Sequence, residues 1–188
     1  TDDTVVVAEI SSFQLETIDT FAPKAAAILN ITPDHLNRHH TMANYIAAKE
    51  SIVKNQTRDD LCVLNYNDEV LRAFGKTLEQ KVVLFSSTET LDAGLYLQEN
   101  EILWARNGKT EHIISVEELN ILGAHNYENV MAAVALCDGM GVPMETIREG
   151  LRDFHAVEHR IEFVCKKNDI AFYNDSKGTN PDAAIKGI

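Results

Sequence analysis

Short, continuous apolar runs alternate with segments of helical periodicity through the first half of the chain. The runs lie at residues 5–8, 25–31, 61–65 and 81–86. Continuous apolar runs are typical of parallel strands buried on both faces, whereas strands with one wet face alternate apolar and polar residues. Strands that alternate with helices in this way predict an α/β fold with a doubly wound, mostly parallel sheet.

The segments between these runs carry helix signals. Ser11 and Gln14 have the spacing of a capping box, so a short helix is expected there. A Thr-Pro pair at residues 32–33 predicts an N-cap followed by proline at the first helical position. Helical periodicity runs through residues 42–55, and a further helix is expected around residues 68–78.

The pattern changes in the second half of the chain. Short apolar stretches at residues 95–97, 102–104 and 112–114 are separated by polar turns, and the Asn-Gly pair at residues 107–108 is a strong hairpin signal. We therefore expect a small antiparallel meander beside the parallel sheet. The remaining expected elements are helices over residues 125–140 and 143–153 and two strands within residues 159–174.

Length and composition narrow the class of protein. A chain of 188 residues suffices for one well-buried domain, or for one domain and part of another. The formal net charge of −12 argues against a nucleic-acid binder, which needs clustered Lys and Arg. No apolar run approaches the roughly 20 residues of a membrane helix. Three separated cysteines without a C-x-x-C pair indicate a reduced, cytoplasmic protein. The first residue is not Met, so a fragment is expected.

Polar side chains follow the first two apolar runs. Glu9 lies where open α/β sheets bind ligands; it suits Mg²⁺, and it could equally stabilise the next helix through its dipole. His35 follows the second run, where a solvated loop histidine is the ordinary interpretation. His39 completes an H-x-x-x-H spacing with His35, but no zincin-type Glu or nearby thiol accompanies the pair, which argues against zinc.

Three further residues have both an ordinary and a functional interpretation. Lys49 ends a Tyr-x-x-Ala-Lys sequence on a predicted helix, and from the sequence alone it is an ordinary surface lysine. Asn126 and Asn129 lie three residues apart on one helix face. Asn126 is a good N-cap residue, while an Asn amide also matches the donor and acceptor on the edge of adenine.

A polar turn follows the last predicted strand. Asp175, Lys177 and Thr179 lie in this turn, whose composition needs no function but provides groups for a ribose hydroxyl, a phosphate and an amino acid. Arg160 precedes the two strands, where it can form a salt bridge at a strand edge or contact a phosphate.

The order of these residues resembles that of the Mur ligases, the ATP-dependent amide-forming enzymes of peptidoglycan precursor synthesis. Mur ligases carry a strand-end Glu, an Asp-His-Leu histidine, a Tyr-x-x-Ala-Lys lysine, a His-Asn-x-x-Asn sequence, a His-Arg pair and a polar turn, and all occur here in that order. The sequences Glu-Ile-Ser-Ser-Phe-Gln-Leu at residues 9–15 and Asn-Asp-Ser-Lys at residues 174–177 are similar to those of the members that add D-glutamate.

The resemblance implies a role for each residue. Glu9 would bind one Mg²⁺, and His35 with a carbamylated Lys49 would bind the second. His35, Lys49 and Lys177 would be catalytic. Carbon dioxide reacts only with a neutral amine, so partial burial must lower the pKa of the lysine. The remaining roles would be ATP binding by His125, Asn126, Asn129, Arg160 and Asp175, and substrate binding by Ser11 and Thr179.

The resemblance also implies a domain organisation and an activity. Residues 1–157 would form the central ATP-binding domain without its P-loop strand, and residues 158–188 would begin a Rossmann-like C-terminal domain. The chain alone would then be inactive, because the P-loop cradles the nucleotide phosphates. The whole protein is expected to be a monomeric cytoplasmic ligase that joins UDP-N-acetylmuramoyl-L-alanine to D-glutamate through an acyl phosphate, without binding nucleic acid or membrane.

Other functions remain compatible with the sequence. A different Mur ligase or a folylpolyglutamate-type ligase would share the same chemistry with another acceptor. A nucleotide-binding module without ligase activity would have no physical need for Glu9, His35 and Lys49 together. An interaction protein is supported only by the predicted meander.

Overall fold

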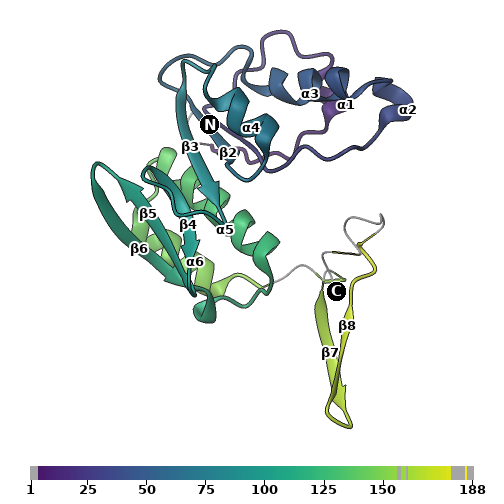
Figure 1. Ribbon diagram of the computed structural model, residues 1–188, viewed down its shortest axis with the longest axis vertical. Helices are drawn as coiled ribbons and strands as arrows, with labels where there is room; N and C mark the ends of the chain where they lie inside the picture. Colours follow the sequence, from purple (N-terminus) through teal and green to yellow (C-terminus); the bar gives the residue numbers. More distant parts are fainter. Residues whose placement is uncertain (1–3, 156–157, 160, 179–184, 186–188) are drawn as a thin grey trace.

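The described part of the chain forms two separate β-sheets (Figure 1). The computed structural model describes residues 4–155, 158–159, 161–178 and 185. The larger sheet has the strand order β1-β2-β3-β4-β5-β6; β1 to β4 run parallel, and β5 and β6 extend the sheet antiparallel, as predicted. Its strands are β1 (Ala25–Ile28), β2 (Leu61–Asn65), β3 (Lys81–Ser86), β4 (Gly94–Gln98), β5 (Glu101–Arg106) and β6 (Lys109–Ser115).

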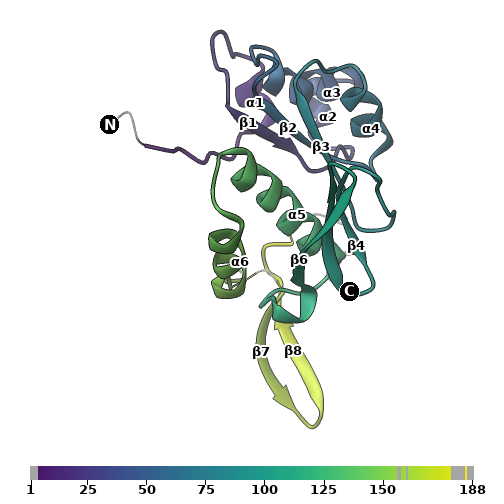
Figure 2. The ribbon, with the colours of Figure 1, turned by 90° about the vertical axis from the view of Figure 1, so that its left-hand side faces the viewer.

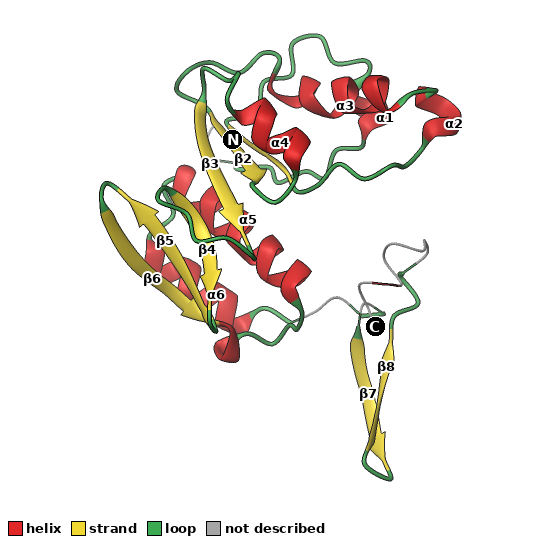
Figure 3. Cartoon of the chain, in the orientation of Figure 1, coloured by secondary structure: helices red, strands yellow, loops and turns green. Residues whose placement is uncertain are grey.

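Helices cover both faces of the larger sheet (Figures 2 and 3), so the predicted doubly wound α/β arrangement is confirmed. One group, which includes α3 and α4, packs on one face, while α5 crosses the other face against β1 to β4. No described helix is long and apolar enough to cross a membrane. The helices are α1 (Ser12–Leu15), α2 (Leu36–His39), α3 (Met42–Glu50), η1 (Ser51–Val53), α4 (Glu69–Gly75), η2 (Val116–Glu118), α5 (Ala124–Gly139) and α6 (Met144–Asp153).

The packing of β2 on both faces explains why its apolar run is continuous. Cys62 and Leu64 point into the core beneath α3 and α4, whereas Leu61 and Val63 point into the core beneath α5. All four side chains are buried, with at most 7% of their surface exposed. The predicted bounds of β2 and β3 therefore agree with the structure, because strands covered on both faces leave an uninterrupted apolar signal.

The antiparallel meander is also confirmed, and two glycines shape it, one in a hairpin turn and one at the start of β4. Asn107 (φ 53°) and Gly108 (φ 70°) both adopt positive φ, as a two-residue type I′ hairpin requires. Gly94 begins β4 with φ 134°, and a Cβ there would lie 2.4 Å from the backbone oxygen of Leu84. Only glycine allows this close approach of β3 and β4.

The strand predicted at residues 5–8 is wrong for this structure. Residues 4–10 have no regular secondary structure and extend away from the sheet (Figure 2). Val5, Val6 and Val7 are 67%, 79% and 94% exposed. Among the described residues no strand pairs with the outer edge of β1, so this segment lacks a neighbour to complete its backbone hydrogen bonds.

Several predicted boundaries differ as well. The second strand ends at Ile28, and the Thr-Pro pair at residues 32–33 does not begin a helix. Instead, α2 starts at Leu36, because His35 adopts a left-handed conformation (φ 54°) that interrupts the helical path after the proline. The helices predicted over residues 42–55 and 68–78 are shorter, and the first of them continues as the 3₁₀ turn η1.

The second sheet is a hairpin of β7 (Glu162–Lys167) and β8 (Ile170–Asn174), which confirms the two strands predicted there. It projects away from the rest of the chain in Figure 1, and its apolar side chains are exposed, with Phe163 at 58% and Phe172 at 48%. The expected domain boundary between residues 157 and 158 falls at residues 156–157, which lie outside the described part of the chain.

A buried carboxylate before β2 gives a testable pH dependence. Asp60 accepts hydrogen bonds from the backbone and hydroxyl of Thr57 (2.7 and 2.9 Å) and from Lys24 Nζ (3.0 Å). The backbone hydrogen bond from Thr57 and the contact with Lys24 lower the pKa of Asp60 from its ordinary 3.8 to about 2. Because the folded pKa is the lower one, this stabilisation is complete above the ordinary pKa and is lost as pH falls towards 2.

Asp60→Asn is expected to lower the melting temperature at pH 7 and to flatten its decline between pH 4 and pH 2. Thermal unfolding followed by circular dichroism across this range measures both effects. The matched control is Asp59→Asn, because the Asp59 side chain is exposed. If the melting temperature of Asp60→Asn fell between pH 4 and pH 2 as steeply as that of the unsubstituted protein, the stabilising role of ionised Asp60 would be contradicted.

Candidate active site

A cluster of aromatic and histidine rings joins α1, α2 and α3. The ring of Phe13 lies 4.9 Å from that of His35 and 5.5 Å from that of His39. His39 in turn lies 5.3 Å from Tyr45, and the guanidinium of Arg38 covers Phe13 at 5.0 Å. These contacts hold three short segments together beyond the carboxyl end of β1, on the edge of the sheet where α/β proteins bind ligands.

Lys49 lies in the same region, one helical turn after Tyr45. Its Nζ is 5.4 Å from the centre of the Tyr45 ring, and the side chain is half-buried. Burial lowers the pKa of Lys49, while the nearby charge of Asp34 acts in the opposite direction. The net direction increases the fraction of neutral amine, which is the form that reacts with carbon dioxide.

Asp34 is a component of this region that sequence reasoning missed. Its Oδ1 accepts a hydrogen bond from the backbone N–H of His35 (2.7 Å), and its Oδ2 lies 3.5 Å from His35 Nε2. The same charge acts on both Lys49 and Tyr45, where it adds to burial in raising the pKa of the tyrosine. Asp34 therefore contacts His35 and acts electrostatically on Lys49. The Asp-His pair in the sequence was the signal that could have identified it.

Glu9 and Ser11 occupy the segment before α1. Ser11 forms the predicted capping box: its backbone and hydroxyl donate to Gln14 Oε1 (2.8 and 2.9 Å), and its hydroxyl accepts from the Gln14 N–H (3.3 Å). Glu9 is exposed and has no strand beneath it. Within the described part of the chain, no three Asp, Glu, His or Cys side chains gather as a metal site. The structure thus associates His35 with Lys49 through Asp34, but among the described residues it shows no metal-type cluster that includes Glu9.

The first turn of α5 corrects one prediction. Gly123, not Asn126, is the N-cap; its φ of 96° favours glycine, and a Cβ there would lie 3.0 Å from the His125 ring. Asn126 lies inside the helix, where its Nδ2 donates to the backbone oxygen of Leu122 (2.7 Å). Asn129 is exposed on the helix surface. The N-cap interpretation of Asn126 is therefore wrong.

Glu128, which sequence reasoning also missed, fixes the start of α5 against the sheet. Its carboxylate accepts hydrogen bonds from Asn65 Nδ2 (3.2 Å) and Ser87 Oγ (2.5 Å). Asn65 ends β2 and Ser87 follows β3, so these contacts place the first turns of α5 at the carboxyl edge of the sheet. His125, Asn126 and Asn129 are thereby held at the edge that also carries the ring cluster.

Asp175 and Lys177 follow the last strand of the second sheet. Asp175 accepts a hydrogen bond from the Ile161 N–H (3.2 Å), and the Lys177 N–H donates to the His159 oxygen (3.0 Å). Both follow β8, which projects away from α1, α2 and α3 (Figure 1). Arg160 and Thr179 lie outside the described residues. Of this group, the described residues Asp175 and Lys177 are not brought to the ring cluster.

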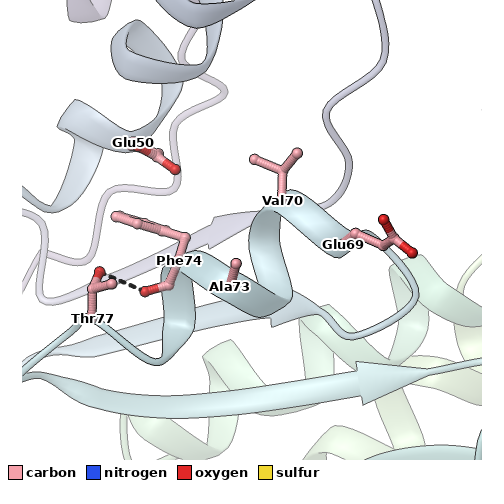
Figure 4. Close-up of a pocket in the computed structure, with 6 residues that line it drawn as sticks. All are labelled: Glu50, Glu69, Val70, Ala73, Phe74 and Thr77. Carbon is pink, nitrogen blue, oxygen red and sulfur yellow. Dashed lines mark hydrogen bonds between the residues drawn. The ribbon is translucent and has the colours of Figure 1, made fainter.

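A surface depression between α3 and α4 contains none of the predicted site residues. Figure 4 shows Phe74 of α4 facing Glu50 of α3, and the Thr77 hydroxyl donating to the Phe74 backbone oxygen (2.8 Å). This depression therefore does not mark the candidate active site. Its lining consists of Glu50, Glu69, Val70, Ala73, Phe74 and Thr77.

The parallel sheet, with polar side chains gathered at its carboxyl edge, defines an α/β ligand-binding domain. The Mur ligase middle-domain family matches residues 1–137. The UDP-N-acetylmuramoylalanine--D-glutamate ligase of Lachnoclostridium phytofermentans is 55% identical over 187 residues, and that of Clostridioides difficile is 47% identical. Each match covers 100% of this chain and 41% of the relative. The chain therefore belongs to the Mur ligase family.

Solved structures agree on the fold. MurC of Thermotoga maritima matches with a TM-score of 0.65 and 25% identity, over 94% of this chain and 39% of that protein. MurF of Thermotoga maritima, solved in complex with ADP, matches with a TM-score of 0.62 and 19% identity, over 88% and 38% of the two chains. The chain spans about two fifths of the length of the curated relatives it matches.

Proposed function

We propose that the whole protein is a cytoplasmic, ATP-dependent ligase that adds D-glutamate to UDP-N-acetylmuramoyl-L-alanine in peptidoglycan precursor synthesis. The observation that carries the proposal is the identity of 46% to 55% to ligases of that name, over essentially the whole chain. In this proposal residues 1–157 are the central ATP-binding domain and residues 158–188 begin the next domain; the two separate sheets support that division.

His35 and a carbamylated Lys49 would hold one Mg²⁺, and Glu9 would hold the other. The half-buried position of Lys49 and its lowered pKa support the first assignment, because carbamylation needs a neutral amine and yields an anion. The exposure of Glu9 gives no comparable support for the second. Bound Mg²⁺ would supply positive charge that allows two anionic reactants to approach each other.

The nucleotide would bind between the two domains. Asn126 and Asn129 would contact the adenine, with His125 adjoining, and the placement of α5 by Glu128 at the carboxyl edge supports this. Asp175 and Lys177, with Arg160, would reach ATP from the second domain after domain closure. Ser11, beside the ring cluster, and Thr179 would contact the substrates.

The chemistry would proceed in two steps. A free carboxylate is a poor electrophile, so its oxygen would first accept the γ-phosphoryl group of ATP, with release of ADP. The amine of D-glutamate would then attack the acyl phosphate, and phosphate would leave as the amide forms. The Lys177 ammonium would balance charge on the phosphoryl group during transfer.

Phosphate release by the whole protein tests this proposal. With ATP, Mg²⁺ and UDP-N-acetylmuramoyl-L-alanine, release is expected only when D-glutamate is added from a panel of amino acids. Release with a different amino acid would overturn the substrate assignment and favour another Mur ligase or a folylpolyglutamate-type ligase. ATP binding without release for any acceptor would indicate a non-catalytic nucleotide-binding module.

A further inference from the structure

His39 is a buried histidine to which the proposed reaction assigns no role. Only 2% of its side chain is exposed. Its Nε2 lies 3.0 Å from the Ser12 hydroxyl, and its Nδ1 lies 3.2 Å from a carboxylate oxygen of Glu16. The ring stacks on Phe13 and packs against Tyr45. Both ring nitrogens therefore have polar partners, and the ring contacts two aromatic side chains.

The chemistry of Glu16 fixes the role of one ring nitrogen. The second carboxylate oxygen of Glu16 accepts from Arg38 (2.7 Å), and this hydrogen bond lowers the pKa of Glu16 and favours its ionised form. A carboxylate can only accept, so Nδ1 of His39 is the donor to Glu16. Nε2 forms the hydrogen bond with the Ser12 hydroxyl.

The order Ser–His–Glu is that of a hydrolase triad, but burial excludes a nucleophilic use. Ser12 is only 4% exposed, and His39 covers its hydroxyl, so no substrate reaches the oxygen. The three residues instead connect α1 to α2. Ser12 is the first residue of α1, Glu16 is its C-cap, and His39 is the last residue of α2. Their interactions hold α2 against α1.

The α2 helix needs such a support. It has four residues, and it is flanked by His35 (φ 54°) and His40 (φ 66°), both at positive φ without being glycine. Conformations of this kind persist only when the surrounding structure holds them. His39 stabilises this conformation because its side chain joins α2 to α1 through Ser12 and Glu16. Its backbone oxygen also accepts a hydrogen bond from the Asn44 side chain of α3 (2.9 Å).

We propose that His39 is a positioning residue, which anchors α2 through Ser12 and Glu16 and thereby sets the position of His35 relative to Lys49. The inference rests on the proposed function for its catalytic consequence. His35 lies at the other end of α2, and Tyr45, which packs on His39, lies beneath the Lys49 ammonium. His39 is thus connected to both candidate catalytic groups: to His35 through α2, and to Lys49 through Tyr45.

His39→Phe tests the anchor in the whole protein, because it keeps the packed ring and removes both polar contacts. We expect kcat to fall by about 10- to 100-fold and the Mg²⁺ concentration for half-maximal rate to rise, as for loss of a residue that orients a metal ligand. The KM for ATP should stay within about twofold, because the nucleotide residues lie elsewhere. His39→Gln should recover most of the rate, since its amide can both donate and accept.

Two further variants complete the design. His40→Asn is the matched control: His40 is exposed and adjacent, Asn tolerates positive φ, and the rate should not change. Ser12→Ala removes only the hydroxyl and is expected to lower kcat in the same direction, so the test remains decisive if His39→Phe does not fold. A folded His39→Phe with unchanged kcat and Mg²⁺ requirement would overturn the proposal.

Hydrogen exchange separates this inference from the proposed function. The amides of Arg38, His39 and His40 donate to the backbone oxygens of His35 and Leu36 within α2. They should exchange at least about tenfold faster in His39→Phe, whereas the amides of β2 should not change. This comparison needs no substrate. Unchanged exchange in α2 would overturn the anchor, whereas absent ligase activity in the unsubstituted protein would overturn only the proposed function.

Discussion

Lys49→Ala is expected to lower D-glutamate-dependent phosphate release by about 100- to 1,000-fold, the usual effect of removing one group that stabilises charge in a transition state. Lys49→Arg should be nearly as inactive, because guanidinium keeps its proton and cannot form a carbamate. Lys54→Ala is the matched control, since Lys54 is an exposed lysine near the end of the same helical segment. Full activity of Lys49→Arg would show that Lys49 acts as a cation.

Carbon dioxide provides an independent measure of the same group. The half-buried position of Lys49 lowers its pKa, so the neutral, reactive fraction grows as pH rises towards that pKa. Activity should therefore fall when carbon dioxide is removed from the solution and return when bicarbonate is added, in the unsubstituted protein but not in Lys49→Ala. Acetate, which restores a carboxylate, is expected to recover part of the Lys49→Ala rate. An unsubstituted protein insensitive to bicarbonate would argue against carbamylation.

The sequence predicted those elements whose signals are local. The apolar runs that became β2 and β3 are covered on both faces, and the Asn-Gly pair at residues 107–108 has the backbone angles that its turn requires. In each case a few neighbouring residues contain the whole signal. The meander and the capping box of Ser11 were predictable for the same reason.

The failures concern interactions between distant segments. Residues 5–8 have the same apolar character as β2, but a strand needs a neighbour, and the described chain places none beside them. Asn126 has the composition of an N-cap, yet Gly123 takes that position because only glycine allows its φ of 96°. The Ser12–His39 contact joins residues far apart in sequence, so no periodicity revealed it. In the sequence, His39 stands out only through its H-x-x-x-H spacing with His35.

Phe85→Ala is expected to cost about 3–5 kcal/mol of folding free energy, which is the usual range for removing a buried aromatic ring. Phe85 has 0% of its surface exposed, and it packs with Leu95 of β4 and Val134 of α5 in the larger core. Since total stability is typically about 5–15 kcal/mol, the variant should unfold at much lower denaturant concentration. Denaturant titration measures the change, and Phe154→Ala, whose ring is 50% exposed, should cost less than about 1 kcal/mol.

Phe85 also connects stability to the candidate active site. It lies two residues before Ser87, which binds Glu128 and holds the first turn of α5 at the carboxyl edge. A cavity beneath this point should loosen α5, so Phe85→Ala is expected to raise the KM for ATP in the fraction that remains folded. Phe85→Leu, which fills more of the volume, should keep both stability and KM closer to those of the unsubstituted protein. A loss of stability in Phe85→Ala with no change in KM would show that Glu128 alone suffices to place α5.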